Sequence, residues 1–165
     1  MEALIVDKPA MKLIGLAKKV TLHDVIENKA TLEVAATFLE RKPEIKNCIN
    51  ESEVFGLSTD PENYNPETDQ FEFFIGIEVS SNDNIPDEMV YREIPANTYV
   101  LFSFQGPFEN AGAVHNYLYS SWLNQSGYEL AGRYNIEIYD ERNHGPHSEN
   151  SITDICFPVR KSRNI

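Results

Sequence analysis

The chain has 165 residues, of which 41% are hydrophobic, and its formal net charge is −12. This hydrophobic content supports a packed core and excludes global disorder, while the negative charge opposes direct binding to a nucleic-acid backbone. No apolar run reaches the roughly 18 residues of a membrane span, and no signal peptide is expected at the N-terminus. The distant cysteines Cys48 and Cys156 are expected to be free thiols of a cytoplasmic protein.

The chain begins with a predicted strand followed by a predicted helix. Residues 11–20 alternate loosely and predict the strand, and residues 22–28 predict a connection. Residues 30–41 are good helix formers, and Pro43 ends or kinks this helix. Its predicted apolar stripe has the spacing i, i+3, i+4, i+7 and is formed by Leu32, Ala35, Ala36 and Leu39.

Two further strands are predicted to complete the first half, at 54–58 and at 70–79. The second is the clearest strand in the chain, because five apolar residues alternate along one face. These are Phe71, Phe73, Ile75, Ile77 and Val79. The polar, proline-containing stretch 60–69 predicts a loop between the two strands, and a second polar loop at 80–88 marks the midpoint of the chain.

The second half repeats the order strand, helix, strand, strand. Residues 89–106 predict a long strand interrupted at Pro95, and residues 110–124 predict a helix that ends at Ser126-Gly127. The last two strands are predicted at 134–141 and 151–160. Two such units can join their sheets edge to edge, with both helices on one face and a concave ligand cleft on the other.

The strand at 134–141 carries the most informative alternation. Tyr134, Ile136 and Ile138 point one way, and Glu137 and Tyr139 point the other. If the isoleucine face packs against helices, Glu137 and Tyr139 face an open groove. A carboxylate flanked by aromatic rings suits an organic cation. The alternative interpretation is a solvated outer strand face with an ordinary glutamate.

Several stretches, in the right order, resemble the GyrI-like domains, also called the effector-binding domains of bacterial AraC-type and MerR-type transcription regulators. The resemblance covers nearly the whole chain. The matching stretches are Phe55-Gly-Leu-Ser, Phe73-Phe-Ile-Gly-Ile-Glu-Val, the segment from Ile94 to the turn Gly106-Pro107, Trp122 to Leu130, Ile136-Glu-Ile-Tyr, and Thr153-Asp-Ile-Cys-Phe-Pro-Val. The family implies an α+β fold of duplicated β-α-β-β units, with a pocket between pseudo-repeats at about 1–84 and 85–165 of one domain, 1–165.

In multidrug-sensing relatives a pocket glutamate meets lipophilic cations, and Glu137 stands at the matching position. The family arrangement also places four aromatic residues on segments that would border Glu137: Tyr91, Tyr99, Phe104 and Phe108. Alternation alone does not decide which of them face the pocket, because a bulge at Pro95 would reset it. Tyr139 and Trp122 are further candidate walls, with core packing as the alternative role of Trp122. Asp154 stands where the family more often has glutamate, so its shorter side chain puts a pocket contact in doubt. No helix-turn-helix flanks the match, which implies the sensing domain without a DNA-binding partner.

The resemblance leaves three functions open. The favoured one is a stand-alone sensor or sequestering protein for lipophilic, cationic small molecules. The second is a hydrolase of cyclopropane-bearing genotoxins, as in some relatives, with Glu137 as general base. The third is a gyrase-inhibitor-like factor that binds a protein partner through the acidic loops 60–69 and 80–88.

The histidines offer weaker candidates. His144, His147 and Glu149 could clip a metal, but they lie in a Pro/Gly loop where a solvated role is favoured. His23-Asp24 has no accompanying nucleophile motif. His115 is interpreted as a helix-surface residue. No cofactor, metal or membrane partner is therefore expected.

Overall fold

The computed structural model describes residues 2–163, which form a single antiparallel sheet with helices. The central pair of strands is β3 (Val54–Thr59) and β8 (Tyr134–Tyr139), and the order across the sheet is β1-β6-β9-β8-β3-β4-β2-β5, with β7 paired to β9. The other strands are β1 (Ala3–Lys8), β2 (Met11–Thr21), β4 (Gln70–Glu78), β5 (Val90–Ile94), β6 (Asn97–Gln105), β7 (Tyr128–Leu130) and β9 (Ile152–Lys161).

The helices follow β2 in the first half and β6 in the second half. The first half carries α1 (Leu22–Asn28), α2 (Ala30–Arg41) and the short 3-10 turn η1 (Lys42–Glu44). The second half carries η2 (Phe108–Asn110) and then α3 (Gly112–Tyr117), the π-helical turn η3 (Leu118–Trp122) and α4 (Leu123–Ser126) in direct succession. The duplicated β-α-β-β order predicted from the sequence is therefore confirmed.

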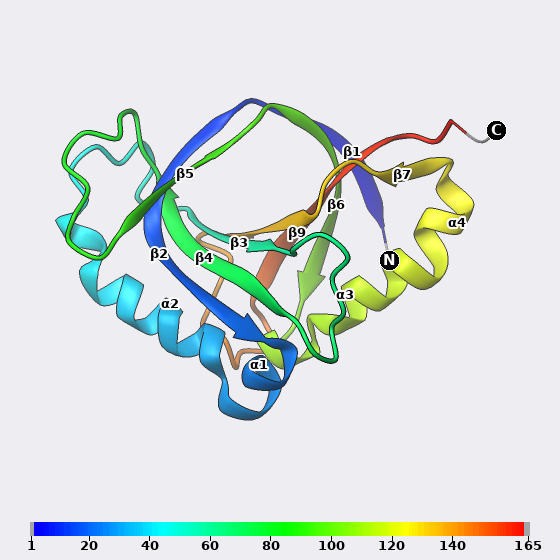
Figure 1. Cartoon of the computed structure of the whole chain (residues 1–165), viewed down its shortest axis with the longest axis horizontal. Coiled ribbons are helices and arrows are strands. Elements are labelled where there is room, and N and C mark those ends of the chain that lie inside the picture. The colour runs from blue at the N-terminus through cyan, green and yellow to red at the C-terminus, as the bar shows by residue number, and fades with distance from the viewer. Residues whose placement is uncertain (1, 164–165) are drawn as a thin grey trace.

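Both sets of helices lie on the same face of the sheet, and strand register shows why. Opposed residues of an antiparallel pair point to the same face. Val54 is opposite Tyr139, and both pack into the apolar cluster under α2. Glu137 is opposite both Gly56 and Ile155, and Ile155 belongs to the apolar cluster under α3. Figure 1 shows the sheet arching over α2 at one end and over α3 and α4 at the other.

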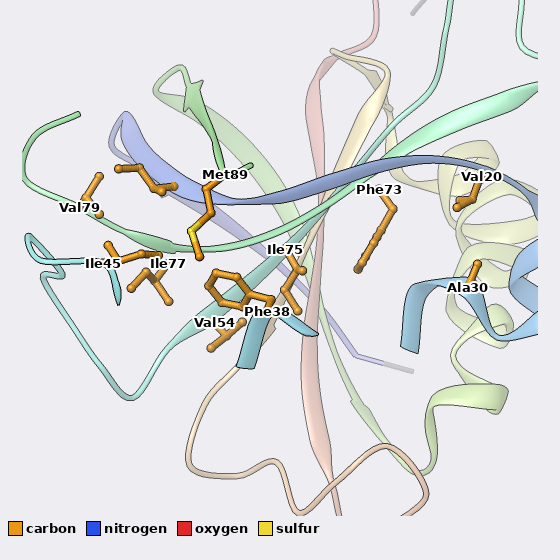
Figure 2. Close-up of a cluster of buried hydrophobic side chains, with 11 residues drawn as sticks. Val20, Ala30, Phe38, Ile45, Val54, Phe73, Ile75, Ile77, Val79 and Met89 are labelled. Atoms are coloured by element: carbon orange, nitrogen blue, oxygen red, sulfur yellow. The ribbon is translucent and has the colours of Figure 1, made fainter. Parts of the chain in front are cut away.

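The helix face thus carries two separate apolar clusters. The first, here the α2 cluster, is centred on Phe38 of α2, which packs among Val54, Ile75 and Ile77 (Figure 2). The second, here the α3 cluster, joins Val114 and Leu118 to five residues of β6 and β9. Those five are Val100, Phe102, Ile155, Phe157 and Val159. Each half-repeat packs its own helix, so the strip of sheet where the halves meet lies between the two clusters.

The face without helices is filled by a third cluster, and this corrects the expectation for β8. Ile136 and Ile138 pack there with Leu13, Phe74 and Tyr99, because the bent sheet folds its outer strands over them. The isoleucine face of β8 therefore points away from the helices. Glu137 and Tyr139 point to the helix side, opposite to the orientation considered from the sequence.

Local differences from the sequence predictions have clear causes. Residues 22–28, predicted as a connection, form α1, because the Thr21 hydroxyl caps the Asp24 amide and the Asp24 carboxylate caps the Thr21 amide. The stretch predicted as one long strand is divided at Pro95 into β5 and β6, which pair with different neighbours. Strands β1 and β7 were not anticipated.

Membrane insertion through a helix finds no support in the described part of the chain. None of the helices formed by residues 2–163 combines the length and the apolar character needed to cross a bilayer.

Candidate functional site

The candidate site is the strip of the helix face where β3 and β8 meet, between the α2 and α3 clusters. We call it the central seam. It consists of Gly56 and Ser58 of β3, of Asp60 directly after that strand, and of Asn135, Glu137 and Tyr139 of β8. Gly56 pairs with Glu137 and Ser58 with Asn135. The amide of Asp60 donates to the Arg133 carbonyl at 2.8 Å, which continues the ladder past the end of β3.

Glu137 and Tyr139 form the polar centre of the seam. Both side chains are half-buried, and the Tyr139 hydroxyl donates a hydrogen bond to Glu137 Oε2. Burial, then the Glu137 charge and this hydrogen bond, raise the pKa of Tyr139 well above its ordinary value. Tyr139 therefore remains a neutral donor, which steadies the carboxylate beside it.

The Tyr139 ring reaches this position because residue 56 is glycine. A Cβ atom on Gly56 would lie 3.3 Å from Tyr139 Cε2 and 3.6 Å from Phe73 Cε1. The first contact is tight, so the Tyr139 ring would have to shift by a few tenths of an ångström, whereas the second is an ordinary van der Waals contact. The missing side chain therefore lets the Tyr139 ring lie against the strand beside Glu137, where an aromatic ring can contact a bound cation.

His115 joins the seam from α3, contrary to its interpretation as a helix-surface residue. Its half-buried ring packs edge-on against Phe157, with centroids 5.2 Å apart. Burial lowers the pKa of His115, while the charges of Glu137 and Asp60 act in the opposite direction. The sequence carried a signal that was missed, because His115 lies three residues before Leu118 and seven before Trp122, on the stripe that packs inward.

Asp60 supplies a second carboxylate. It is half-buried, and within residues 2–163 its side chain has no hydrogen-bond or ion-pair partner. Burial raises the pKa of Asp60, and the nearby His115 opposes that shift. Asp60 also lines a cavity of about 530 Å³ at the ends of β2, β3 and β4, where Lys19, Thr59 and Glu72 of the face without helices are further lining residues.

Between the two carboxylates lies a third acceptor. The Oδ1 atom of Asn135 is buried and finds no hydrogen-bond donor within the described chain. Chemically, the seam offers hydrogen-bond acceptors and negative charge between apolar walls. This combination suits a positively charged organic group better than an anion. Across residues 2–163 no cluster of three or more His, Cys, Asp or Glu side chains is arranged to hold a metal.

Four sequence candidates occupy other parts of the helix face. Trp122 stacks on Tyr128, with centroids 5.7 Å apart, and packs in the α3 cluster as its core interpretation predicted. Phe104 also borders that cluster. Phe108 lies in η2, and the Tyr91 hydroxyl donates to Glu93 at 3.2 Å. Among residues 2–163, none of these four side chains has a hydrogen bond or an ion pair with Glu137.

Two candidates lie on the opposite face, because alternation along their strands points them away from Glu137. Tyr99 is fully buried in the third cluster, and its hydroxyl lies 3.0 Å from that of Tyr134. Asp154 is opposite Ile138, accepts a hydrogen bond from Ser103 and pairs with Arg142 at 2.8 Å. The doubt about Asp154 is thus resolved by its direction rather than by its length.

The face without helices also has a cavity, of about 260 Å³. Its apolar side includes Leu57, Ile94 and Tyr134, and its rim includes the ion pair of Arg92 with Glu72. The sheet separates this cavity from Glu137. Arg92 and Glu72 are already paired with each other, and Glu93 accepts a hydrogen bond from Tyr91, so the central seam is the stronger candidate for binding.

Comparison with known proteins connects this geometry to a family. The family model "GyrI-like small molecule binding domain" matches residues 1–160. The transcriptional regulator BrlR of Pseudomonas aeruginosa is 26% identical over 164 residues, which cover 96% of this chain. The chain spans 56% of the length of that relative.

Solved structures share the fold at low sequence identity. The EcmrR C-terminal domain has a TM-score of 0.71 at 18% identity and covers 97% of this chain and 98% of its own. SAV2435, solved bound to tetraphenylphosphonium, has a TM-score of 0.65 at 16% identity, with 97% and 94% covered. A Listeria innocua protein named a hydrolase has a TM-score of 0.56 at 13% identity, with 96% and 92% covered.

Proposed function

The chain belongs to the GyrI-like small molecule binding domain family, and from this premise we propose that it captures lipophilic organic cations in the central seam. The ligand's positive centre pairs with Glu137, and its apolar groups contact Tyr139, Phe73 and the flanking clusters. A fold neighbour bound to tetraphenylphosphonium, a lipophilic cation, supports this ligand class.

One observation carries the proposal. The Glu137 carboxylate is half-buried between two apolar clusters, and within residues 2–163 it has a hydrogen bond from Tyr139 but no ion-pair partner. A partly desolvated charge without a counter-ion is costly, and a tyrosine hydroxyl offsets only part of that cost. A bound cation completes the compensation in a medium where charge attraction is stronger than in water.

The same hydrogen bond favours binding over hydrolysis. A general base needs a free lone pair aimed at the water from which it takes a proton. The Tyr139 hydroxyl already donates to one oxygen of this carboxylate and holds it in place. Glu137 is better suited to hold a cation than to take a proton from water.

The test is a calorimetric titration with tetraphenylphosphonium and with a neutral tetraaryl compound of similar shape. We expect saturable binding of the cation and clearly weaker binding of the neutral compound. A parallel incubation with a cyclopropane-bearing alkylator, followed by chromatography, separates retention from turnover. Equal affinity for cation and neutral compound would overturn the proposal, and formation of a hydrolysed product would favour the enzyme.

A further inference from the structure

The second carboxylate of the seam, Asp60, is not needed to hold a single positive charge at Glu137. We propose that Asp60 forms a second subsite for positive charge, so that the seam prefers an elongated diamine whose two ammonium groups pair with Glu137 and Asp60. This inference rests on the proposed function and adds the shape and charge number of the ligand.

The spacing of the two carboxylates follows from strand geometry. Gly56 is opposite Glu137, and Asp60 lies four residues further along the same chain. At about 3.3 Å per residue the two positions are about 13 Å apart. Asp60 lies on the helix side with Glu137, because its amide continues the ladder opposite Arg133 and alternation places it on the same face as Gly56 and Ser58. A ligand with one compact charge cannot contact both carboxylates, whereas a chain with a charge at each end can.

The protein leaves the Asp60 charge uncompensated. Its side chain has no ion-pair or hydrogen-bond partner among the described residues. His115, whose pKa responds to the Asp60 charge, is held towards its neutral form by burial. Beside Asp60, the residues Glu62, Asp69 and Lys19 line a cavity of about 530 Å³ that opens on the face without helices. The surplus of carboxylates adds negative charge around Asp60 and favours the approach of an ammonium group.

The groups around Asp60 suit an alkylammonium end. Burial, and after it the charge of Asp60, raises the pKa values of both Tyr64 and Tyr119, so both tyrosines interact electrostatically with this carboxylate. Tyr64 packs edge-on against Phe71, with centroids 6.3 Å apart, and Phe71 lines the cavity. Aromatic rings beside a carboxylate can contact both the charge and the methylene groups of an amine.

Asn135 adds a preference for N–H donors. Its buried Oδ1 atom accepts no hydrogen bond within residues 2–163. Along the seam, Asn135 lies between Glu137 and Asp60. A buried acceptor without a partner is costly, so a ligand that donates to it binds more tightly. A primary ammonium has such donors, and a quaternary ammonium has none.

The experiment compares diaminodecane with decylamine, which has the same carbon chain and a single charge. Calorimetric titrations are made with wild type, Asp60→Asn, Glu137→Gln and the control Glu67→Gln. Glu67 lies exposed in the same loop, outside the cavity lining, so its variant removes one negative charge from the neighbourhood only. Circular dichroism and thermal melting confirm that each variant is folded.

We expect wild type to bind diaminodecane about tenfold or more tightly than decylamine, the scale of one charge-assisted contact. Asp60→Asn should weaken binding of diaminodecane more than binding of decylamine and so remove this preference, while Glu67→Gln should keep it. Glu137→Gln should weaken the binding of both amines. Equal wild-type affinities for the two amines, or a preference that survives Asp60→Asn, would overturn the second subsite while leaving the proposed function intact. Binding of neither amine would contradict the inference, and the tetraphenylphosphonium titration would show whether the proposed function fails with it.

Discussion

At the scale of single residues, Ile136 and Glu137 are neighbours in the chain but serve different parts of the molecule. Ile136 is fully buried in the cluster on the face without helices. Glu137 points to the seam between the two helix-side clusters, where Tyr139 donates to it. One strand thus supplies a core residue and a site residue in alternation. The Glu137 carboxylate is the group that distinguishes this seam from an ordinary apolar core.

His115 gives the seam a pH dependence. Burial, the largest cause, lowers its folded pKa, so the unfolded chain takes up a proton that the folded protein resists. The contribution of His115 to stability is therefore fully present well above the ordinary histidine pKa of about 6.5, and it is lost as the pH falls below that value. We predict that His115→Asn reduces the loss of stability between about pH 7 and pH 5.

Urea unfolding midpoints at those two pH values measure this effect. The exposed His23 provides a matched control, since His23→Asn makes the same substitution outside the seam. A His115→Asn slope equal to that of wild type would show that the imidazole is not held in its neutral form by burial.

At the scale of elements, α2 shows how a correct helix can be placed with the wrong phase. The helix bounds of 30–41 match the prediction, but the buried stripe is Thr31, Val34 and Phe38 rather than the stripe ending at Leu39. Phe38 is fully buried, whereas Leu39 is 54% exposed. Composition alone favours either leucine or phenylalanine as an anchor, and only the sheet beneath decides between them.

We predict that Phe38→Ala lowers the free energy of unfolding by about 3–5 kcal/mol, because it leaves a cavity where α2 meets the sheet. Leu39→Ala, one position along, should change it by no more than about 0.5 kcal/mol. Chemical denaturation of both variants tests the observed phase. If Leu39→Ala lowered the free energy of unfolding more than Phe38→Ala, the helix would bury the stripe expected from the sequence instead.

The sequence was sufficient for the architecture and insufficient for the site. Alternation and helix periodicity identified most strands and both long helical regions, since burial imposes those periods locally. The direction of β8 could not be derived, because Ile136 and Ile138 fit an apolar core on either side of the sheet. His115 and Asp60 were missed because their importance arises from elements that meet only in the folded chain.

At the scale of the whole molecule, two half-repeats with separate clusters leave a polar seam between them, and the chain carries a formal charge of −12. That charge draws in cations and opposes phosphate. We predict no binding of duplex DNA by residues 1–165 at physiological salt. A gel shift at micromolar protein that persists at that salt would contradict this prediction.

The central claim is that the Glu137 carboxylate binds the positive centre of a ligand, and one titration tests it most directly. A rhodamine-like cation and a neutral analogue are titrated by fluorescence against wild type, Glu137→Gln and the exposed control Glu141→Gln. We predict that Glu137→Gln weakens binding of the cation by about 1.5–3 kcal/mol, the scale of a charge-assisted hydrogen bond. Binding of the neutral analogue should weaken much less. Glu141→Gln should match wild type. Equal cation affinity in Glu137→Gln and wild type would remove Glu137 from the site and contradict the account.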